Sequence, residues 1–190
     1  MKPIYIIEHL EPELGTWCMF EYERISQLVG KENLWFTNVK EQSAKLNSLG
    51  TVKKESVKTL NLQHACVLDP EAKELLTPEN VKPYQYIIIG GILGDYPPKK
   101  RTKKELTKFV HNAHHYHIGK KQFSTDNAVY VVDHIVKGKP FKSIKTQYKI
   151  SIPVDDIASI DLPYCYPLDT TGAPLMSPKL LHYLKTKEGF

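Results

Sequence analysis

The chain has 190 residues, 41% hydrophobic and 25% charged, with a formal net charge of +5. These values fit one soluble domain, or a domain with a small appendage, and do not by themselves require a nucleic-acid partner. No apolar run is as long as a membrane span, and the N-terminus lacks signal- or transit-peptide features, so we expect a cytoplasmic protein without membrane contact. Three distant cysteines without CxxC spacing indicate reduced thiols.

In the first half, short β-branched runs alternate with amphipathic stretches. Strands are predicted at residues 4–7, 34–36 and 65–68. Helices are predicted at residues 11–29, before the stop at Gly30, and at 40–48. Residues 53–58 are charged and show no period, so we expect an exposed segment there.

The second half contains the most hydrophobic strand, over residues 84–89. It lacks alternation, which is typical of a parallel strand covered by helices on both faces. Further strands are predicted at 114–118 and, as an edge strand, at 148–152, and further helices at 102–109, 124–136 and 177–187. Residues 153–176 hold four prolines and only short apolar groups. The alternation predicts an α/β fold with a mostly parallel sheet and helices on both faces.

Two stretches are the most informative, YIIIGGILGD (86–95) and HIGKKQFSTDNAVYVV (117–132). Each begins as a buried strand and ends in a glycine-containing loop, and the second loop opens directly into a helix. Ligands of open α/β sheets lie beyond the carboxyl ends of the strands, and glycine lets the backbone approach a ligand. Either stretch alone is also typical of an ordinary turn, but the pair together predicts a nucleotide cradle.

The pair resembles the last two motifs of the SPOUT methyltransferases, matched here by IIIGGILGD and by GKKQFSTDNAV (119–129). The segments GGILGDYPPKKRT (90–102), IIEHLEPELGTW (6–17) and CVLDP (66–70) are similar to one SPOUT subfamily. That subfamily includes a eukaryotic protein arginine methyltransferase acting on a small-subunit ribosomal protein, and archaeal members described as RNA methyltransferases. The resemblance covers nearly the whole chain and is weakest over residues 40–62 and 139–163.

The resemblance implies a C-terminal trefoil knot and S-adenosyl-L-methionine (SAM) as cofactor. It divides the chain into an α/β-knot core at 1–138 and an extension at 139–190 packed on the same domain. It places adenosine between the two glycine loops. The cofactor-binding residues expected on this basis are Leu68, Pro70, Gly90, Gly91, Gly94, Ile118, Gly119, Gln122, Phe123, Ser124 and Thr125.

Two acids, Glu8 and Asp95, follow strands that should end at the ligand-binding edge. Each has an ordinary interpretation as a cap or surface group. The functional interpretation is a carboxylate that holds an arginine acceptor, whose guanidinium stays charged in water and must be oriented and lose a proton on methylation. We predict Glu8 and Asp95 as the catalytic pair, with His9 and Arg101 contacting the substrate.

Several functions remain open at this stage. The first is methylation of an arginine on a ribosomal protein, with the small ribosomal subunit as partner. The second is methylation of rRNA or tRNA, although Cys66–Pro70 lacks the arginine that many such enzymes carry early in the knot, and the basic loop has Tyr96 as its only aromatic residue. The third is a non-catalytic module that binds SAM or the ribosome.

Two structural questions complete the expectations. A monomer is favoured over a homodimer, because residues 153–176 could cover a dimer face. His111, His114, His115 and His117 run into a predicted strand, where neighbouring side chains point to opposite faces. We therefore do not predict a metal site at these histidines.

Overall fold

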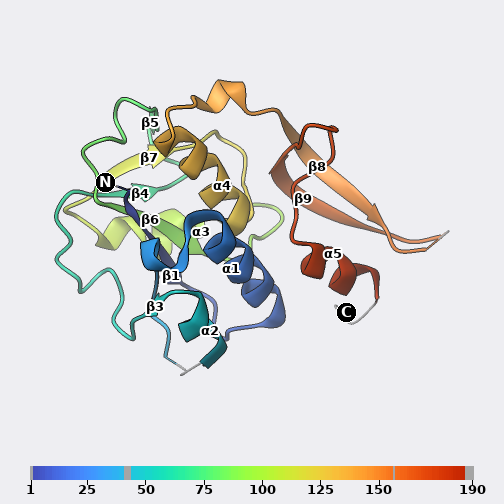
Figure 1. Cartoon of the computed structure of the whole chain (residues 1–190), viewed down its shortest axis with the longest axis horizontal. Coiled ribbons are helices and arrows are strands. Elements are labelled where there is room, and N and C mark those ends of the chain that lie inside the picture. Colours follow the sequence, from blue (N-terminus) through green and yellow to red (C-terminus); the bar gives the residue numbers. More distant parts are fainter. Residues whose placement is uncertain (1, 41–43, 156, 187–190) are drawn as a thin grey trace.

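A computed structural model describes residues 2–40, 44–155 and 157–186 (Figure 1). Its centre is a seven-stranded sheet with strand order β3-β2-β1-β6-β4-β7-β5, in which every pairing is parallel. The strands are β1 (Ile4–His9), β2 (Leu34–Thr37), β3 (Thr51–Val52), β4 (Ala65–Leu68), β5 (Glu74–Leu75), β6 (Tyr86–Gly91) and β7 (His114–His117). The mostly parallel α/β sheet predicted from the sequence is confirmed.

Helical segments cover the sheet on both faces. They are α1 (Thr16–Val29), η1 (Lys31–Asn33), α2 (Ala44–Leu49), α3 (Arg101–Glu105), η2 (Thr107–Phe109), α4 (Thr125–Val136), η3 (Phe141–Ser143) and α5 (Pro178–Lys185). Helices α1, α2 and α4 contribute to one hydrophobic cluster, and α1 packs directly against α4. The opposite cluster contains Val57, Leu106 and Val110, from the residues after β3 and from the α3–η2 region.

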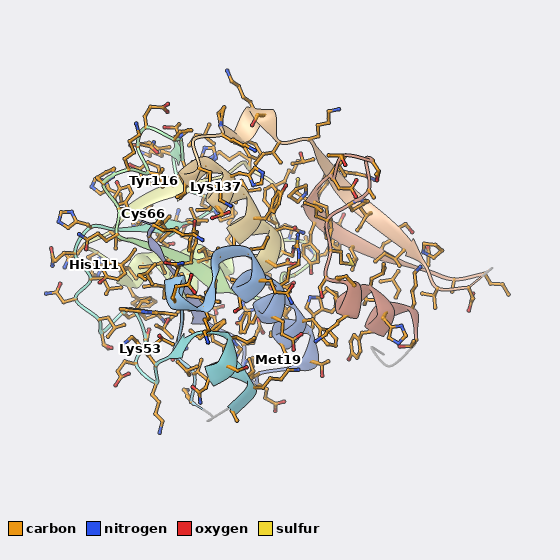
Figure 2. All side chains as sticks on the ribbon, in the orientation of Figure 1. Met19, Lys53, Cys66, His111, Tyr116 and Lys137 are labelled. Carbon is orange, nitrogen blue, oxygen red and sulfur yellow. The ribbon has the colours of Figure 1, made fainter. Side chains whose placement is uncertain are left out.

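The two clusters divide the central strands residue by residue. Ile7 lies in the α1 cluster, whereas Ile6 lies in the opposite one, as expected when successive side chains point to opposite faces. Both faces are buried, which explains the continuous apolar runs. Cys66 of β4 and Tyr116 of β7 are likewise buried on neighbouring strands (Figure 2).

The C-terminal part forms an antiparallel hairpin, β8 (Thr146–Pro153) with β9 (Ser159–Pro167), followed by α5 (Figure 1). This part has its own hydrophobic cluster, against which Trp17 and Phe20 of α1 pack. The backbone N–H of Cys165 also donates to the carbonyl of Gln122 at 2.7 Å. The division of the chain at residue 138 stays a prediction.

Several element boundaries differ from the predictions. Helix α1 begins at Thr16 rather than near residue 11, because Glu11 bonds to the loop after β6 instead of opening a helix. The predicted helix 102–109 is interrupted at Leu106, where the backbone leaves helical geometry. Strand β9 was not predicted, although Ile160 and Leu162 alternate. The predicted start of the second helix and end of the last helix fall partly outside the described residues.

Membrane and metal features can be assessed only over residues 2–40, 44–155 and 157–186. Within them, no helix combines the length and apolarity needed to cross a bilayer. The same residues contain no group of three or more His, Cys, Asp or Glu side chains arranged to hold a metal ion.

Candidate functional site

One cavity of the described structure has a volume of about 300 Å³ and lies beyond the C-terminal ends of β4, β6 and β7. Its lining comes from three parts of the chain, within residues 68–71, 89–102 and 117–128. The sheet order explains this convergence, because β4 lies between β6 and β7 and all three strands point the same way. The two glycine-containing loops therefore meet at one site.

Most residues predicted to bind a cofactor line this cavity. They are Leu68, Pro70, Gly90, Gly94, Ile118, Gly119, Gln122, Phe123 and Thr125. The predicted catalytic Asp95 and the predicted substrate contact Arg101 line it as well. Their positions agree with the predicted site, while their roles in binding stay predictions.

Gly91 and Ser124 do not line the cavity, and their predicted cofactor contacts stay predictions. Gly91 faces α1, where an added Cβ would lie against the Tyr22 hydroxyl and 2.9 Å from Ile7 Cγ2. Its small size is thus required for packing. Ser124 is buried at the start of α4 and donates to Asp126 Oδ1 at 2.7 Å.

Glu8 also lies away from the cavity. Strand alternation places its side chain on the face of Ile6, and it is fully buried there. Its carboxylate accepts hydrogen bonds from Thr37 Oγ1 at 2.5 Å, from Val57 N at 3.1 Å and from Ser56 Oγ. The prediction of an exposed segment at 53–58 is therefore wrong at Val57, and that segment covers the acid predicted to face a substrate.

His9 points to the opposite face from Glu8 and is buried against α1. Its Nδ1 is 2.9 Å from the Tyr22 hydroxyl. Burial lowers the pKa of His9, and the nearby carboxylates of Glu11 and Glu8 only partly offset this effect. His9 is therefore a packed strand-end residue, and its predicted contact with substrate stays a prediction.

Asp95 differs from Glu8 in its surroundings. It lines the cavity, keeps a side-chain exposure of 25% and pairs with Lys99 Nζ at 2.7 Å. The hydrogen bond from Lys99, helped by the positive charges of Lys99 and Arg101, lowers the pKa of Asp95. Asp95 is thus an ionised carboxylate at the cavity whose present partner is a largely exposed lysine.

Arg101 lines the cavity but already has several protein acceptors. Its guanidinium donates to Glu11 Oε1 at 2.7 Å, to Glu105 Oε1 at 2.8 Å and to the carbonyl of Leu10 at 3.1 Å. Glu11 Oε1 also accepts the backbone N–H of Leu93. Arg101 therefore connects the segment before α1 to the loop after β6, which indicates a positioning role, and its predicted substrate contact stays a prediction.

Sequence reasoning missed Tyr164, which reaches the site from β9. Its hydroxyl donates to the carbonyl of Gly94 at 2.7 Å. Burial raises the pKa of Tyr164, and the charges of Glu21, Asp95 and Glu11 add to this effect. Through this hydrogen bond to Gly94, the hairpin forms part of the wall around the loop after β6.

Glu21 is a second missed residue, and its position had a signal in the sequence. It lies on the apolar side of α1 between Trp17 and Ile25, where a carboxylate is unexpected. Burial raises the pKa of Glu21 to about 8, assisted by the charge of Asp126 and opposed by hydrogen bonds from Trp17 and Thr125. Because Thr125 lines the cavity, Glu21 supports the cavity wall from behind.

The comparisons with known proteins agree with this geometry. Residues 4–189 match the family model described as "Protein arginine N-methyltransferase SFM1-like". The Saccharomyces cerevisiae protein arginine N-methyltransferase SFM1 is 32% identical over 199 residues, which cover 95% of this chain and 93% of the yeast protein.

Solved structures show the same fold. Yeast SFM1 complexed with SAM aligns with a TM-score of 0.90 at 30% identity, covering 100% of this chain and 93% of that one. Its complex with S-adenosylhomocysteine (SAH) gives 0.88 at 30% identity, covering 96% and 94%. Trm10 from Thermococcus kodakaraensis gives 0.59 at 19% identity, covering 75% and 96%, which supports the SPOUT fold alone. The chain belongs to the SFM1-like family of protein arginine N-methyltransferases.

Proposed function

We propose that this protein is a SAM-dependent methyltransferase whose acceptor is an arginine of a ribosomal protein. The observation that carries the proposal is the cavity where the two glycine loops meet, with the ionised carboxylate of Asp95 at its wall. The activity follows from membership of the SFM1-like family and from the SAM and SAH complexes of the yeast relative. The ribosomal acceptor is an extension drawn from the resemblance of the motifs.

The lining of the cavity fits SAM. Ile89, Ile92, Ile118, Phe123 and Ala128 provide an apolar wall against which an adenine ring can pack. The glycines at 90 and 119 leave backbone groups accessible where larger side chains would crowd the cradle, and Gly119 has a φ of +112° that favours glycine. When bound, SAM supplies an activated methyl group on a positively charged sulfur.

Asp95 is suited to hold the acceptor because it already binds a cation. Lys99 occupies one of its oxygens through an ion pair whose lysine side chain is 68% exposed. Such exposed pairs contribute little stability, so a substrate guanidinium can replace the lysine at low cost. A guanidinium offers the carboxylate two parallel donors, which a lysine cannot do.

The chemistry requires mainly orientation. As the guanidinium nitrogen bonds to the methyl carbon and the carbon–sulfur bond breaks, the acceptor nitrogen loses a proton to the adjacent carboxylate or to water. Asp95 would align the nitrogen and stabilise the positive charge before transfer. Glu11 and Arg101 would keep the loop that carries Asp95 in place.

The assembly and topology of the protein are also part of the proposal. We expect a monomer, because β8, β9 and α5 already pack on α1. We expect the chain between about residues 92 and 123 to form a loop through which the segment containing α4 is threaded, as in SPOUT proteins, although such threading is rare. A crystal structure with an unthreaded chain, or light scattering showing a stable dimer, would contradict these expectations.

One experiment tests the function directly. The purified protein is incubated with methyl-labelled SAM and small ribosomal subunits, and protein and RNA are then separated. We expect label in a ribosomal protein, released on hydrolysis as methylarginine, together with a rise in melting temperature when SAM is added. Label in rRNA would support the alternative acceptor, and binding of SAM without any transfer would support a non-catalytic module. A cytoplasmic location would be consistent with access to ribosomal subunits.

A further inference from the structure

Positive charge is concentrated in one continuous part of the chain. Residues 99–149 contain 13 Lys or Arg and 3 Asp or Glu, a formal charge of +10, whereas the whole chain carries +5. The remaining residues are therefore net acidic, at −5. The total charge hides this asymmetry. The positive segment begins at Lys99, just after the first glycine loop, and contains the whole of the second one.

The acids within this segment do not neutralise its surface. Glu105 pairs with Arg101, Asp126 with Arg24 of α1, and Asp133 with Lys137 at the end of α4. Exposed lysines remain along the segment at positions 103, 104, 108, 120, 121, 139, 142, 145 and 149. Lys120 and Lys121 line the cavity itself, so this positive surface reaches the cavity wall.

Two exposed tyrosines lie within this surface and alternate with lysines. Lys121 Nζ is 4.5 Å from the ring centre of Tyr148, and Lys149 Nζ is 5.7 Å from the same ring. Lys149 Nζ is also 5.0 Å from the ring centre of Tyr96 and 3.2 Å from its hydroxyl. We call Tyr96, Lys121, Tyr148 and Lys149 the tyrosine–lysine ladder.

The ladder connects the cavity to the hairpin. Lys121 lines the cavity, and Tyr96 directly follows Asp95. A β-bulge lies between Tyr148 and Ile150, and Lys149 has a left-handed backbone conformation there. The bulge allows the consecutive residues Tyr148 and Lys149 to lie on the same surface of β8. Tyr96 is 63% exposed and Tyr148 39% exposed, which is unusual for aromatic rings in this protein.

We propose that the tyrosine–lysine ladder and the lysines around it bind single-stranded RNA next to the acceptor. This inference rests on the proposed function and names a docking partner for it. Lysines that follow a phosphate backbone, with tyrosines on which bases stack, are the features of single-strand binding surfaces. An acceptor arginine is itself positively charged and would be repelled by this positive surface, so an anion between the two favours their approach. The RNA is a partner that presents the ribosomal protein, and the methyl group goes to the protein.

Binding is measured with a fluorescent oligouridine of about twelve nucleotides, in the absence of SAM and acceptor, by anisotropy at several salt concentrations. The variants are Lys149→Gln and the double change Tyr96→Ala with Tyr148→Ala, none of which lines the cavity. The matched control removes two exposed lysines, Lys31→Gln with Lys82→Gln, which come just before β2 and β6, at the N-terminal ends of the strands, whereas the cavity lies beyond the C-terminal ends. Circular dichroism and SAM titration check that each variant is folded.

We expect the double tyrosine variant to weaken RNA binding about tenfold or more, because stacking contributes at each base. Lys149→Gln should weaken binding and reduce its salt dependence by about one phosphate contact, whereas the lysine control should change binding less than about twofold. Methylation of a short free arginine peptide should stay unchanged in the ladder variants. This arm separates failure of docking from failure of the proposed activity.

Other outcomes would overturn the inference. Absence of RNA binding at low salt would remove it, as would equal weakening by the ladder variants and the lysine control. Tighter binding of a polyglutamate peptide than of oligouridine would assign the ladder and its surrounding lysines to an acidic protein partner. Transfer of label from SAM to the RNA would make RNA the acceptor instead of the docking partner.

Discussion

Glu8 and Asp95 occupy comparable places in the chain and very different places in the molecule. Glu8 lies near the C-terminal end of β1, where it pairs in register with Gly90 of the neighbouring parallel strand β6, and Asp95 follows β6 by four residues. Glu8 is fully buried, with hydrogen bonds from Thr37, Ser56 and Val57, whereas Asp95 lies at the cavity with an exposed lysine as partner.

The difference teaches that the end of a strand does not by itself make a functional acid. The role of the acid depends on whether another segment of the chain covers the end of its strand. Residues 53–62 fold over the end of β1 and use Glu8 to satisfy their own donors, whereas the loop after β6 continues for four residues and carries Asp95 to the cavity wall. A buried, fully bonded carboxylate serves structure, and an accessible carboxylate with a replaceable partner can serve a substrate.

The largest expected effect separates these two acids directly. Asp95→Asn keeps the size of the side chain but removes the charge that orients the guanidinium. We expect a fall of roughly hundredfold in the rate of single-turnover methylation of an arginine peptide, with SAM affinity changed only a few-fold. Glu8→Gln is the matched control, and its rate per folded molecule should stay within a few-fold of the original protein.

The control should instead lose stability. An amide at Glu8 places a donor among groups that also donate, and each buried mismatch costs about 1–3 kcal/mol. Urea unfolding should show this loss for Glu8→Gln and little change for Asp95→Asn. If Glu8→Gln abolished methyl transfer while remaining fully folded, the structural role given to Glu8 would be wrong. The prediction from the sequence that Glu8 and Asp95 are both catalytic would then be supported.

The adjacent glycines at 90 and 91 extend the comparison to the strand itself. An added Cβ at Gly91 meets Tyr22 and Ile7, so Gly91→Ala should destabilise the protein by about 1–3 kcal/mol through overpacking, with unchanged SAM affinity in the folded fraction. At Gly90 the nearest atom is the flexible end of Ile92 at 3.0 Å, inside the cavity wall. Gly90→Ala should therefore weaken SAM binding in calorimetry with a smaller loss of stability. If Gly91→Ala mainly weakened SAM binding and Gly90→Ala mainly lowered stability, the sheet faces assigned to these two glycines would be wrong.

These differences show what could be predicted from the sequence. Apolar runs and glycine loops were sufficient to predict the parallel sheet and the meeting of the two loops at one cavity. They could not identify the faces of Glu8 and Gly91, because a strand buried on both faces has no polar side to mark its orientation. Val57 was missed since its segment has no period, and the ladder was missed because a bulge and two distant loops bring Tyr96 and Tyr148 into one surface.

A third acid, Glu21, tests burial in a different way, through pH. Its pKa is raised from an ordinary 4.5 to about 8, chiefly by burial, so the folded protein holds a proton there that the unfolded chain releases. Stability from this group is full below the unfolded pKa and is lost as pH rises through the folded pKa. The expected loss is about 1 kcal/mol between about pH 7 and 9.

Glu21→Gln should remove that slope, because the neutral amide resembles the protonated acid. Urea unfolding of both proteins across this pH range measures the difference, and Arg24 and Asp126 remain in place as the nearby ion pair. If the free energy of unfolding changed equally with pH in the two proteins, Glu21 would be ionised in the folded state. Its place behind Thr125 would then not depend on a bound proton.

The smallest expected effect concerns the exchangeable partner of Asp95. If Lys99 only occupies the carboxylate until a guanidinium arrives, Lys99→Ala removes a competitor and should lower the KM for an RNA-free arginine peptide by about twofold to fivefold, the scale of an exposed ion pair. The kcat should not change, since the lysine has left before transfer, and the gain should shrink as salt screens the original pair. The matched variant Lys103→Ala removes a nearby exposed lysine that has no ion pair among the described residues, and its KM should stay as it was. A KM that rises in Lys99→Ala would mean that the lysine contacts the substrate or cofactor itself, and Asp95 would then be a residue held in place by its lysine.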